Sequence, residues 1–163
     1  MARYHRLGKV PQKRHITFKK PDGSLYSEQL ISSEGFASEY SLSYHVHRPT
    51  RVLSIDKSID VSPKYINNDL MVNRSFQGFE LKACDDYLES RQVVLGNDDT
   101  VISLAAPRHS MEKYFYKNSQ AAEMIFVHRG NGTLKTMYGN IVFREGDHLI
   151  IPKSVIYQLH FNT

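Results

Sequence analysis

Short apolar runs bounded by turn residues recur along the chain and predict strands rather than helices. In the second half, strands are predicted over residues 91–95, 100–105, 111–117, 123–128, 134–138, 141–144, 148–151 and 155–161. Many short strands at even spacing are typical of an antiparallel sandwich or barrel of the jelly-roll kind. We therefore expect an all-β, cupin- or jelly-roll-like antiparallel β-sandwich or barrel with very little helix.

The pattern is weaker before residue 91. It predicts an extended strand over 42–53, and one long strand over 70–81 or two strands with a bend at Gly78. The acidic stretch 85–90 is the one short helical candidate. Two turns are predicted in the second half: Gly130-Asn131-Gly132, which requires positive φ, and a two-residue hairpin turn at Gly139-Asn140.

Composition indicates a globular protein with enough apolar material for a core. Hydrophobic residues make up 40% of the 163 residues and charged residues 23%. No run is long and apolar enough for a membrane helix, and no apolar segment follows the basic N-terminus as in a secretory signal. The single cysteine, Cys84, excludes an internal disulfide framework and a four-cysteine zinc site. We expect a reduced intracellular compartment, the cytoplasm, and no membrane partner.

Positive charge is concentrated at the N-terminus, although the net charge is only +4. Residues 3–20 contain no acid and seven basic residues: Arg3, Arg6, Lys9, Lys13, Arg14, Lys19 and Lys20. A nucleic-acid partner is one interpretation. We favour an arm that packs on its own domain or on a neighbouring subunit, because few aromatic residues and no binding motif accompany the charge.

The spacing of two segments matches the frame of cupin barrels. Motif one ends with Glu, six residues and Gly, as in Glu123 to Gly130; motif two begins with Gly, five residues and Pro, as in Gly146 to Pro152. In a metal-binding barrel, His-x-His, a Glu and a third His surround a divalent iron or manganese. Imidazoles two residues apart on a strand point to the same side.

The ligand residues of that frame are missing. Depending on the spacer, the first two His positions fall on Tyr116 and Asn118, or on Lys117 and Ser119. The third His position falls on Tyr157, the Gly of motif two on Ser154, its Asn on Phe161, and the first Gly of motif one on Ser110 or Met111. Only Glu123 remains as a possible ligand, and one carboxylate cannot hold a catalytic metal.

Strand alternation indicates what fills the barrel instead. Val155, Tyr157, Leu159 and Phe161 share one face of the last strand and are all apolar or aromatic. We expect that face to point inward, with Tyr157 in the place of an imidazole and a hydrogen bond between Tyr157 and Glu123. His45-Val46-His47 is a further His-x-His pair, but no Glu follows it at the motif spacing, so we interpret it as a polar face. We assign no catalytic, cofactor-binding or metal-binding residue.

Segments along the whole chain resemble bacterial homogentisate 1,2-dioxygenases. They lie at residues 4–15, 21–30, 34–36, 44–50, 108–112, 115–118 and 146–152, and include the run Tyr44-His45-Val46-His47-Arg48-Pro49-Thr50. The resemblance implies a degenerate N-terminal cupin half of an enzyme that opens the homogentisate ring with Fe(II) and oxygen, giving maleylacetoacetate in tyrosine and phenylalanine breakdown. It also implies that the iron ligands, two His and one Glu, belong to a C-terminal half, so this chain alone would hold no cofactor and would be inactive.

Together these observations give a domain organisation and two main functional alternatives. We expect residues 1–55 to form a basic arm and first strands that pack on a degenerate, metal-free cupin barrel of residues 56–163, as one structural unit. The last predicted strand reaches nearly to Thr163, from which we expect the natural chain to continue. The first alternative is the N-terminal half of the dioxygenase, partnered by its C-terminal half or by other subunits in a homo-oligomer. The second is a stand-alone, metal-free cupin that binds a small molecule or a protein.

Overall fold

The computed structural model describes residues 18–32, 40–49, 51–56, 58, 60, 62–66 and 72–162. Its residues fall into two units, Met1–Asp60 and Val61–Thr163. The basic arm lies mostly in residues 1–17, outside the described part of the chain. Its predicted packing on the barrel therefore stays a prediction. No helix within the described ranges is long and apolar enough to cross a bilayer.

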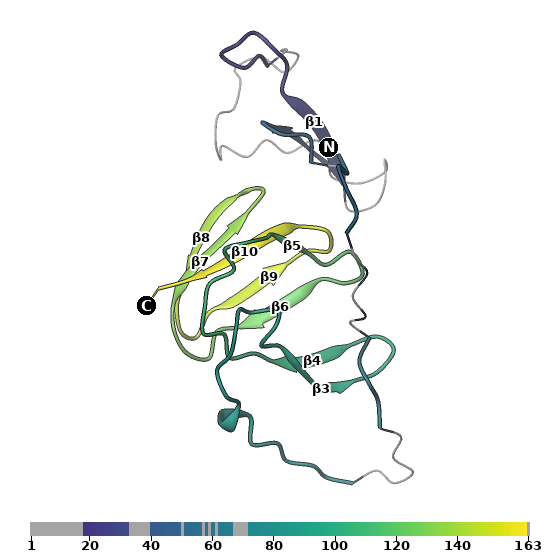
Figure 1. Cartoon of the computed structure of the whole chain (residues 1–163), viewed down its shortest axis with the longest axis vertical. Helices are drawn as coiled ribbons and strands as arrows, with labels where there is room; N and C mark the ends of the chain where they lie inside the picture. Colours follow the sequence, from purple (N-terminus) through teal and green to yellow (C-terminus); the bar gives the residue numbers. More distant parts are fainter. Residues whose placement is uncertain are drawn as a thin grey trace. The chain divides into compact units, whose positions relative to one another are not determined.

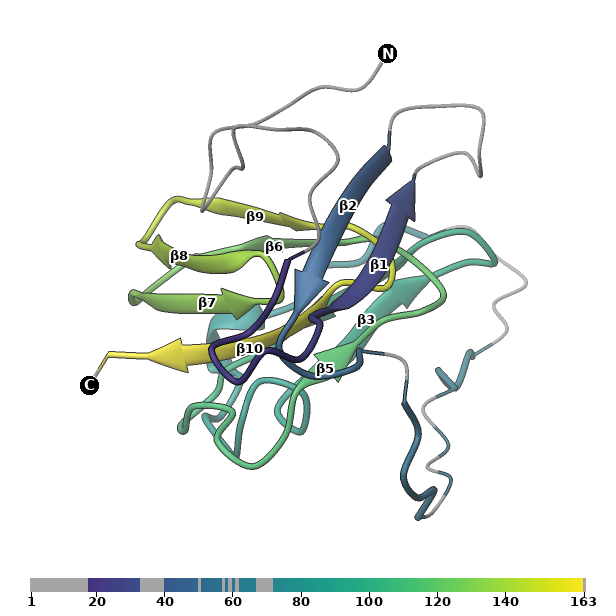
Figure 2. The ribbon, with the colours of Figure 1, turned by 90° about the horizontal axis from the view of Figure 1, so that it is seen from above.

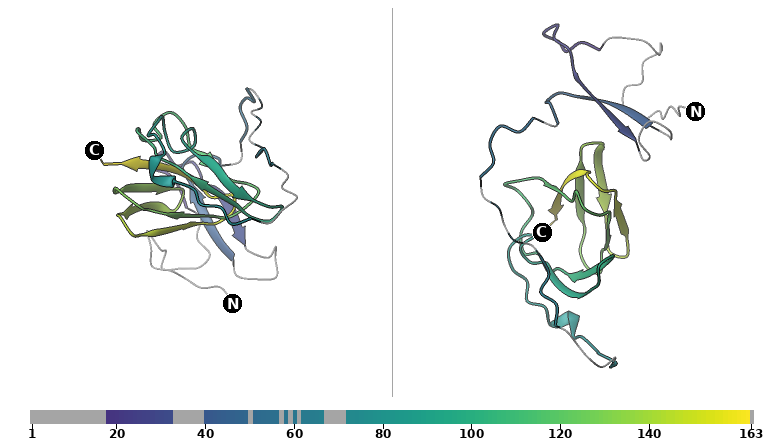
Figure 3. Two further views of the ribbon diagram at one scale, coloured as in Figure 1. Left: turned by 90° about the horizontal axis from the view of Figure 1, so that it is seen from below. Right: turned by 90° about the vertical axis from the view of Figure 1, so that its right-hand side faces the viewer.

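The described residues of the first unit include an antiparallel hairpin. Strand β1, Ser27–Ser32, pairs along its whole length with β2, Tyr40–His45 (Figures 1 and 3). Strand β1 was not predicted, because SEQLIS contains only two apolar residues. The prediction of a strand over 42–53 is wrong beyond His45: Val46, Val52 and Leu53 are exposed, and no strand among the described residues pairs with them. A strand needs a hydrogen-bonded neighbour as well as an extended sequence.

The second unit is built from antiparallel strands, as predicted. Its largest sheet has the order β5-β10-β7-β8, with β5 at Tyr116–Lys117, β7 at Gly132–Thr136, β8 at Gly139–Phe143 and β10 at Ile156–Phe161. Strand β10 lies between β7 and β5 (Figure 2). Two further pairs join β3, Gln92–Gly96, to β4, Val101–Leu104, and β6, Glu123–Phe126, to β9, His148–Ile151. The described strands of the second unit form an all-β sandwich whose sheets do not close into a barrel.

Buried side chains from strands β7 to β10 and from the segments next to them form the core. Tyr157 and Leu159 are 0% and 2% exposed, and the same cluster contains Tyr87, Met111, Val127, Leu134, Phe143, Leu149, Ile151 and Val155. The predicted inward face of the last strand is thereby confirmed, with Phe161 only half-buried at its end.

Several predicted elements are shorter or shifted. Residues 72–77 form no strand and lead into a single 3-10 turn, η1, at Gly78–Glu80. Residues 85–90 form turns rather than a helix, since Asp86 accepts hydrogen bonds from the N–H groups of Leu88 and Glu89. Of residues 111–117 only the last two are strand. Met111 is buried and donates a backbone hydrogen bond to the carbonyl of Leu159, but no ladder continues from it.

The turns around β7 also differ from the prediction. Strand β7 begins at Gly132 and ends at Thr136, two residues earlier than expected, so Met137 and Tyr138 make the hairpin turn instead of Gly139-Asn140. Gly130 has the expected positive φ of 92°, but Gly132 does not. A Cβ on Gly132 would lie 2.1 Å from the carbonyl oxygen of His160, so this glycine is needed for the close approach of β7 to β10.

Candidate functional site

Three of the cupin ligand positions converge inside the second unit. Tyr116 and Tyr157 are opposed across β5 and β10, and their rings meet edge to face with centroids 5.5 Å apart. The Tyr157 hydroxyl donates a 2.8 Å hydrogen bond to Oε2 of Glu123, at the start of β6, which confirms the predicted contact. Tyr116 is half-buried, whereas Lys117 is exposed. The first His position of motif one therefore corresponds to Tyr116, which is the alternative with four residues between the second His position and Glu123.

The fourth ligand position has a different role. Asn118 accepts hydrogen bonds on its side-chain oxygen from the N–H groups of Gln120 and Ala121, and on its carbonyl oxygen from Ser154 N–H. Ser154 itself has φ of +69°, a left-handed conformation at the position where the motif carries glycine. The backbone geometry of the motif frame is thus retained although its ligands are replaced.

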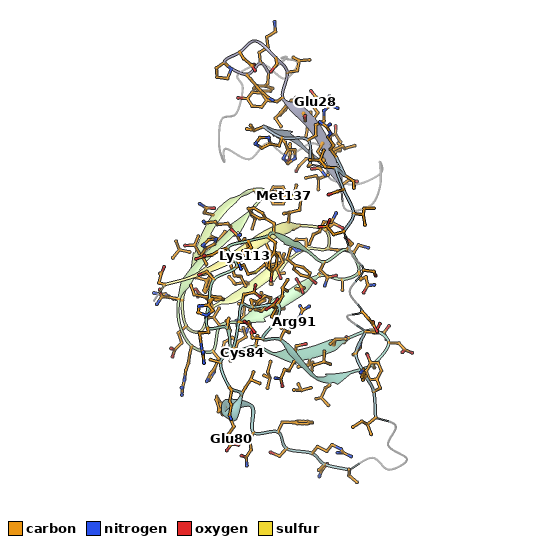
Figure 4. All side chains as sticks on the ribbon, in the orientation of Figure 1. Glu28, Glu80, Cys84, Arg91, Lys113 and Met137 are labelled. Carbon is orange, nitrogen blue, oxygen red and sulfur yellow. The ribbon has the colours of Figure 1, made fainter. Side chains whose placement is uncertain are left out.

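Arg91 completes the site and was not identified from the sequence. Its Nη1 donates to Oε1 of Glu123 at 2.9 Å, and its guanidinium carbon lies 5.7 Å from the ring centroid of Tyr116 and 5.9 Å from that of Tyr87. The Arg91 side chain is 28% exposed and that of Glu123 11%. Figure 4 shows Arg91 within the strands of the second unit. We refer to Tyr87, Arg91, Tyr116, Glu123 and Tyr157 as the Arg91–Glu123 cluster.

The electrostatics of the cluster favour neutral phenols beside one ion pair. Burial, together with the negative charge of Glu123, raises the pKa of Tyr87 and of Tyr157. The pKa of Arg91 is raised in spite of its burial, which acts in the other direction, because Tyr116, Tyr87 and Glu123 stabilise the guanidinium. At neutral pH the cluster therefore holds one negative and one positive charge, each with polar partners.

A second polar network fixes the 85–90 turn against β10. The Tyr114 hydroxyl donates to Oδ2 of Asp86, and the amide of Gln158 donates to the Tyr114 carbonyl at 3.0 Å. Burial and the Asp86 carboxylate raise the pKa of Tyr114. This network positions the turn that carries Tyr87.

A broad groove opens beside the cluster. It encloses about 1530 Å³ and is lined by Tyr87 and Arg91, by core residues such as Leu149 and Leu159, and by Ile102 on β4. Of the cluster, Tyr87 and Arg91 line the groove, whereas Tyr116, Glu123 and Tyr157 do not.

The other candidate residues are not brought together. His45 hydrogen-bonds Gln29 through Nε2 at 2.9 Å, whereas His47 lies beyond β2 and is exposed. Cys84 is a free, half-buried thiol. Over the ranges that the structure describes, no group of three or more His, Cys, Asp or Glu is placed to hold a metal ion. The expected absence of iron is left to experiment.

Comparisons with known proteins show a similarity to a longer protein. The chain is 34% identical over 167 aligned positions to a Saccharolobus solfataricus protein named "Putative dioxygenase SSO1533". The alignment covers 99% of this chain but 42% of that protein, so the chain spans less than half the length of this curated relative. No protein-family model and no solved structure matches. The chain is thus a β-sandwich with a cupin-like frame and is similar to part of a dioxygenase-like protein.

Proposed function

We propose that this chain is the N-terminal, non-catalytic half of a homogentisate 1,2-dioxygenase-like non-haem iron oxygenase. In this role it acts as a scaffold for a C-terminal half that binds Fe(II) and opens the aromatic ring. The observation that carries the proposal is the similarity to the dioxygenase-like relative along 99% of this chain and only 42% of that protein. The finer assignment to homogentisate rests on the sequence segments that resemble that family.

The contents of the cupin-like centre support a scaffold role. A facial iron site uses two His and one carboxylate and leaves coordination positions open for oxygen and substrate. Here the carboxylate of Glu123 is hydrogen-bonded through both oxygens, to Arg91 and to Tyr157. Tyrosines occupy the two converging His positions, so the residues of this centre do not fit a catalytic iron.

Reconstitution of activity tests the proposal. The chain would be co-expressed with a C-terminal half that matches the remainder of the dioxygenase-like relative, and oxygen uptake would be measured with homogentisate and Fe(II). We expect uptake only when both halves are present. Activity of this chain alone would refute the assignment of catalysis to the other half, and full activity of the C-terminal half alone would refute the scaffold role.

The groove favours a second candidate, a stand-alone cupin that binds a small molecule. Its mixed lining of apolar core residues and the Arg91 guanidinium is typical of ligand sites. The coding sequence after Thr163 separates the candidates, since the dioxygenase requires a downstream region with His, Glu and His ligands. If that region is lacking, and a ligand screen raises the thermal midpoint of the chain, the stand-alone function is favoured.

A further inference from the structure

We infer that the Arg91 guanidinium is the resident cation of the cupin-like centre, in the place where a divalent metal would sit in a metal-binding barrel. Arg91 thereby keeps divalent metals out. Replacing Arg91 with alanine and placing His at positions 116 and 157 should create a metal site, with Glu123 as the third ligand. The inference rests on the geometry of the second unit and does not depend on the proposed enzyme.

Position is the first argument. The three side chains at motif ligand positions meet, and the cation that contacts them among the described residues is Arg91, 2.9 Å from Glu123 Oε1 and 5.7 Å from the Tyr116 ring centroid. In the unaltered chain both oxygens of that carboxylate are taken, Oε1 by Arg91 and Oε2 by Tyr157. When Tyr157 is replaced, a metal on Oε2 would still lie beside the positive guanidinium, which repels it. Guanidinium and metal therefore compete for one location.

Charge is the second argument. Glu123 supplies one negative charge, which Arg91 balances, while Tyr157 donates a neutral hydroxyl to the other carboxylate oxygen. A partly buried carboxylate without a cation would be costly, so some positive group is required here. The planar guanidinium also lies near the faces of Tyr87 and Tyr116, contacts that a lysine ammonium reproduces less well.

The number of converging positions defines the site that would result. Asn118 is used in the turn before β6, so three positions remain, and His at 116 and 157 with Glu123 would form a two-His, one-carboxylate set. That set binds divalent iron, and its N and O donors also suit Co(II).

The test compares Co(II) binding by four folded proteins, using visible absorption and calorimetry. They are the unaltered chain, Tyr116→His/Tyr157→His, the same pair with Arg91→Ala, and the same pair with Arg108→Ala. Arg108 is a matched control, because it lines the same groove but donates to the carbonyl of Ala83 rather than to Glu123. We expect the Arg91→Ala triple variant to bind one Co(II) about 100-fold more tightly than the His pair alone, comparable to the largest effects of groups next to metal ligands. The Arg108→Ala triple variant should gain nothing.

Two results would overturn the inference. One is equally tight Co(II) binding when Arg91 is retained, and the other is a folded Arg91→Ala triple variant that does not bind. If circular dichroism shows that the triple variant is unfolded, the single variant Arg91→Ala decides. Millimolar methylguanidinium should then raise its thermal midpoint and leave that of the unaltered chain unchanged; no rise, or an equal rise in both, counts against a resident cation.

Discussion

Tyr157 links the packing of the second unit to its polar centre. The ring is fully buried, and the hydroxyl spans from β10 to Glu123 on β6. We expect Tyr157→Ala to cost about 3 kcal/mol of unfolding free energy, as for other large buried side chains cut to alanine. Tyr157→Phe should cost about 1 kcal/mol, the scale of one lost hydrogen bond. Urea unfolding measures both, and an unchanged midpoint for Tyr157→Ala would contradict the inward orientation of β10.

Alkaline pH should destabilise the folded protein through the tyrosines whose pKa is raised by the fold. The folded-state pKa values of Tyr87, Tyr114 and Tyr157 are raised above the ordinary value of 10, so the folded chain retains protons that the unfolded chain loses. Stability is then fully present below pH 10 and falls as pH rises above it, by up to about 1.4 kcal/mol per pH unit for each group. Urea unfolding between pH 9 and 11 should show a shallower decline for Tyr157→Phe than for the unaltered chain. Equal slopes would show that Tyr157 does not contribute.

The sequence predicts the positions of Tyr157 and Glu123, which belong to the cupin motifs, but not the role of Arg91, which lies outside them. Tyr157 and Glu123 have fixed positions in the cupin frame, and strand alternation gives their orientation. Arg91 lies 32 residues before Glu123 in the chain, just ahead of β3. Its role depends on how β3 and β6 come together, and a local sequence pattern does not predict which strands lie close to each other.

At the scale of elements, the turn before β10 offers a direct stability test. Ser154 is exposed with φ of +69°, and its backbone N–H, which glycine also has, donates to the Asn118 carbonyl. We expect Ser154→Gly to stabilise the chain by about 0.5 kcal/mol, because glycine adopts this conformation without the steric cost.

Gly146 provides the matched opposite case. Its φ is +88° and a Cβ there would meet no atom within 4 Å, so the conformation alone sets the cost of a side chain. Gly146→Ala should destabilise by about 1 kcal/mol. Thermal unfolding of both variants measures the pair, and a loss of stability in Ser154→Gly would contradict the strained turn.

Elements with strong alternation and clear turns were the predictable ones. Strand β9 matches its predicted range, and β3, β4, β6 and β10 agree to within two residues at each end. The failures at 46–53 and 72–77 share a cause, because these extended sequences find no partner strand within the described residues. Strand β7 begins early because Gly132 fits where the chain passes the His160 carbonyl, a contact that involves a distant strand.

On the scale of the whole molecule, one exposed face of the β6–β9 pair is apolar. Met124 and Ile150 are paired across it and are 69% and 72% exposed, with Phe126 beside them, and Met124 and Phe126 also line the groove. In the proposed function this face is available to a partner, so the isolated chain should self-associate. Ile150→Lys should shift the chain towards monomer in size-exclusion chromatography with light scattering. Val142→Lys, at an equally exposed position on edge strand β8, is the control and should have a smaller effect.

The central claim is that the cupin-like centre is filled by side chains and that iron chemistry belongs elsewhere. The most direct measurement is the iron content of the purified chain after anaerobic loading with Fe(II) and removal of excess metal. We predict far less than one iron per chain, because Arg91, Tyr116 and Tyr157 surround Glu123 where ligands and metal would be. About one tightly held iron per chain, lost on Glu123→Gln or on replacement of His45 and His47, would contradict the account.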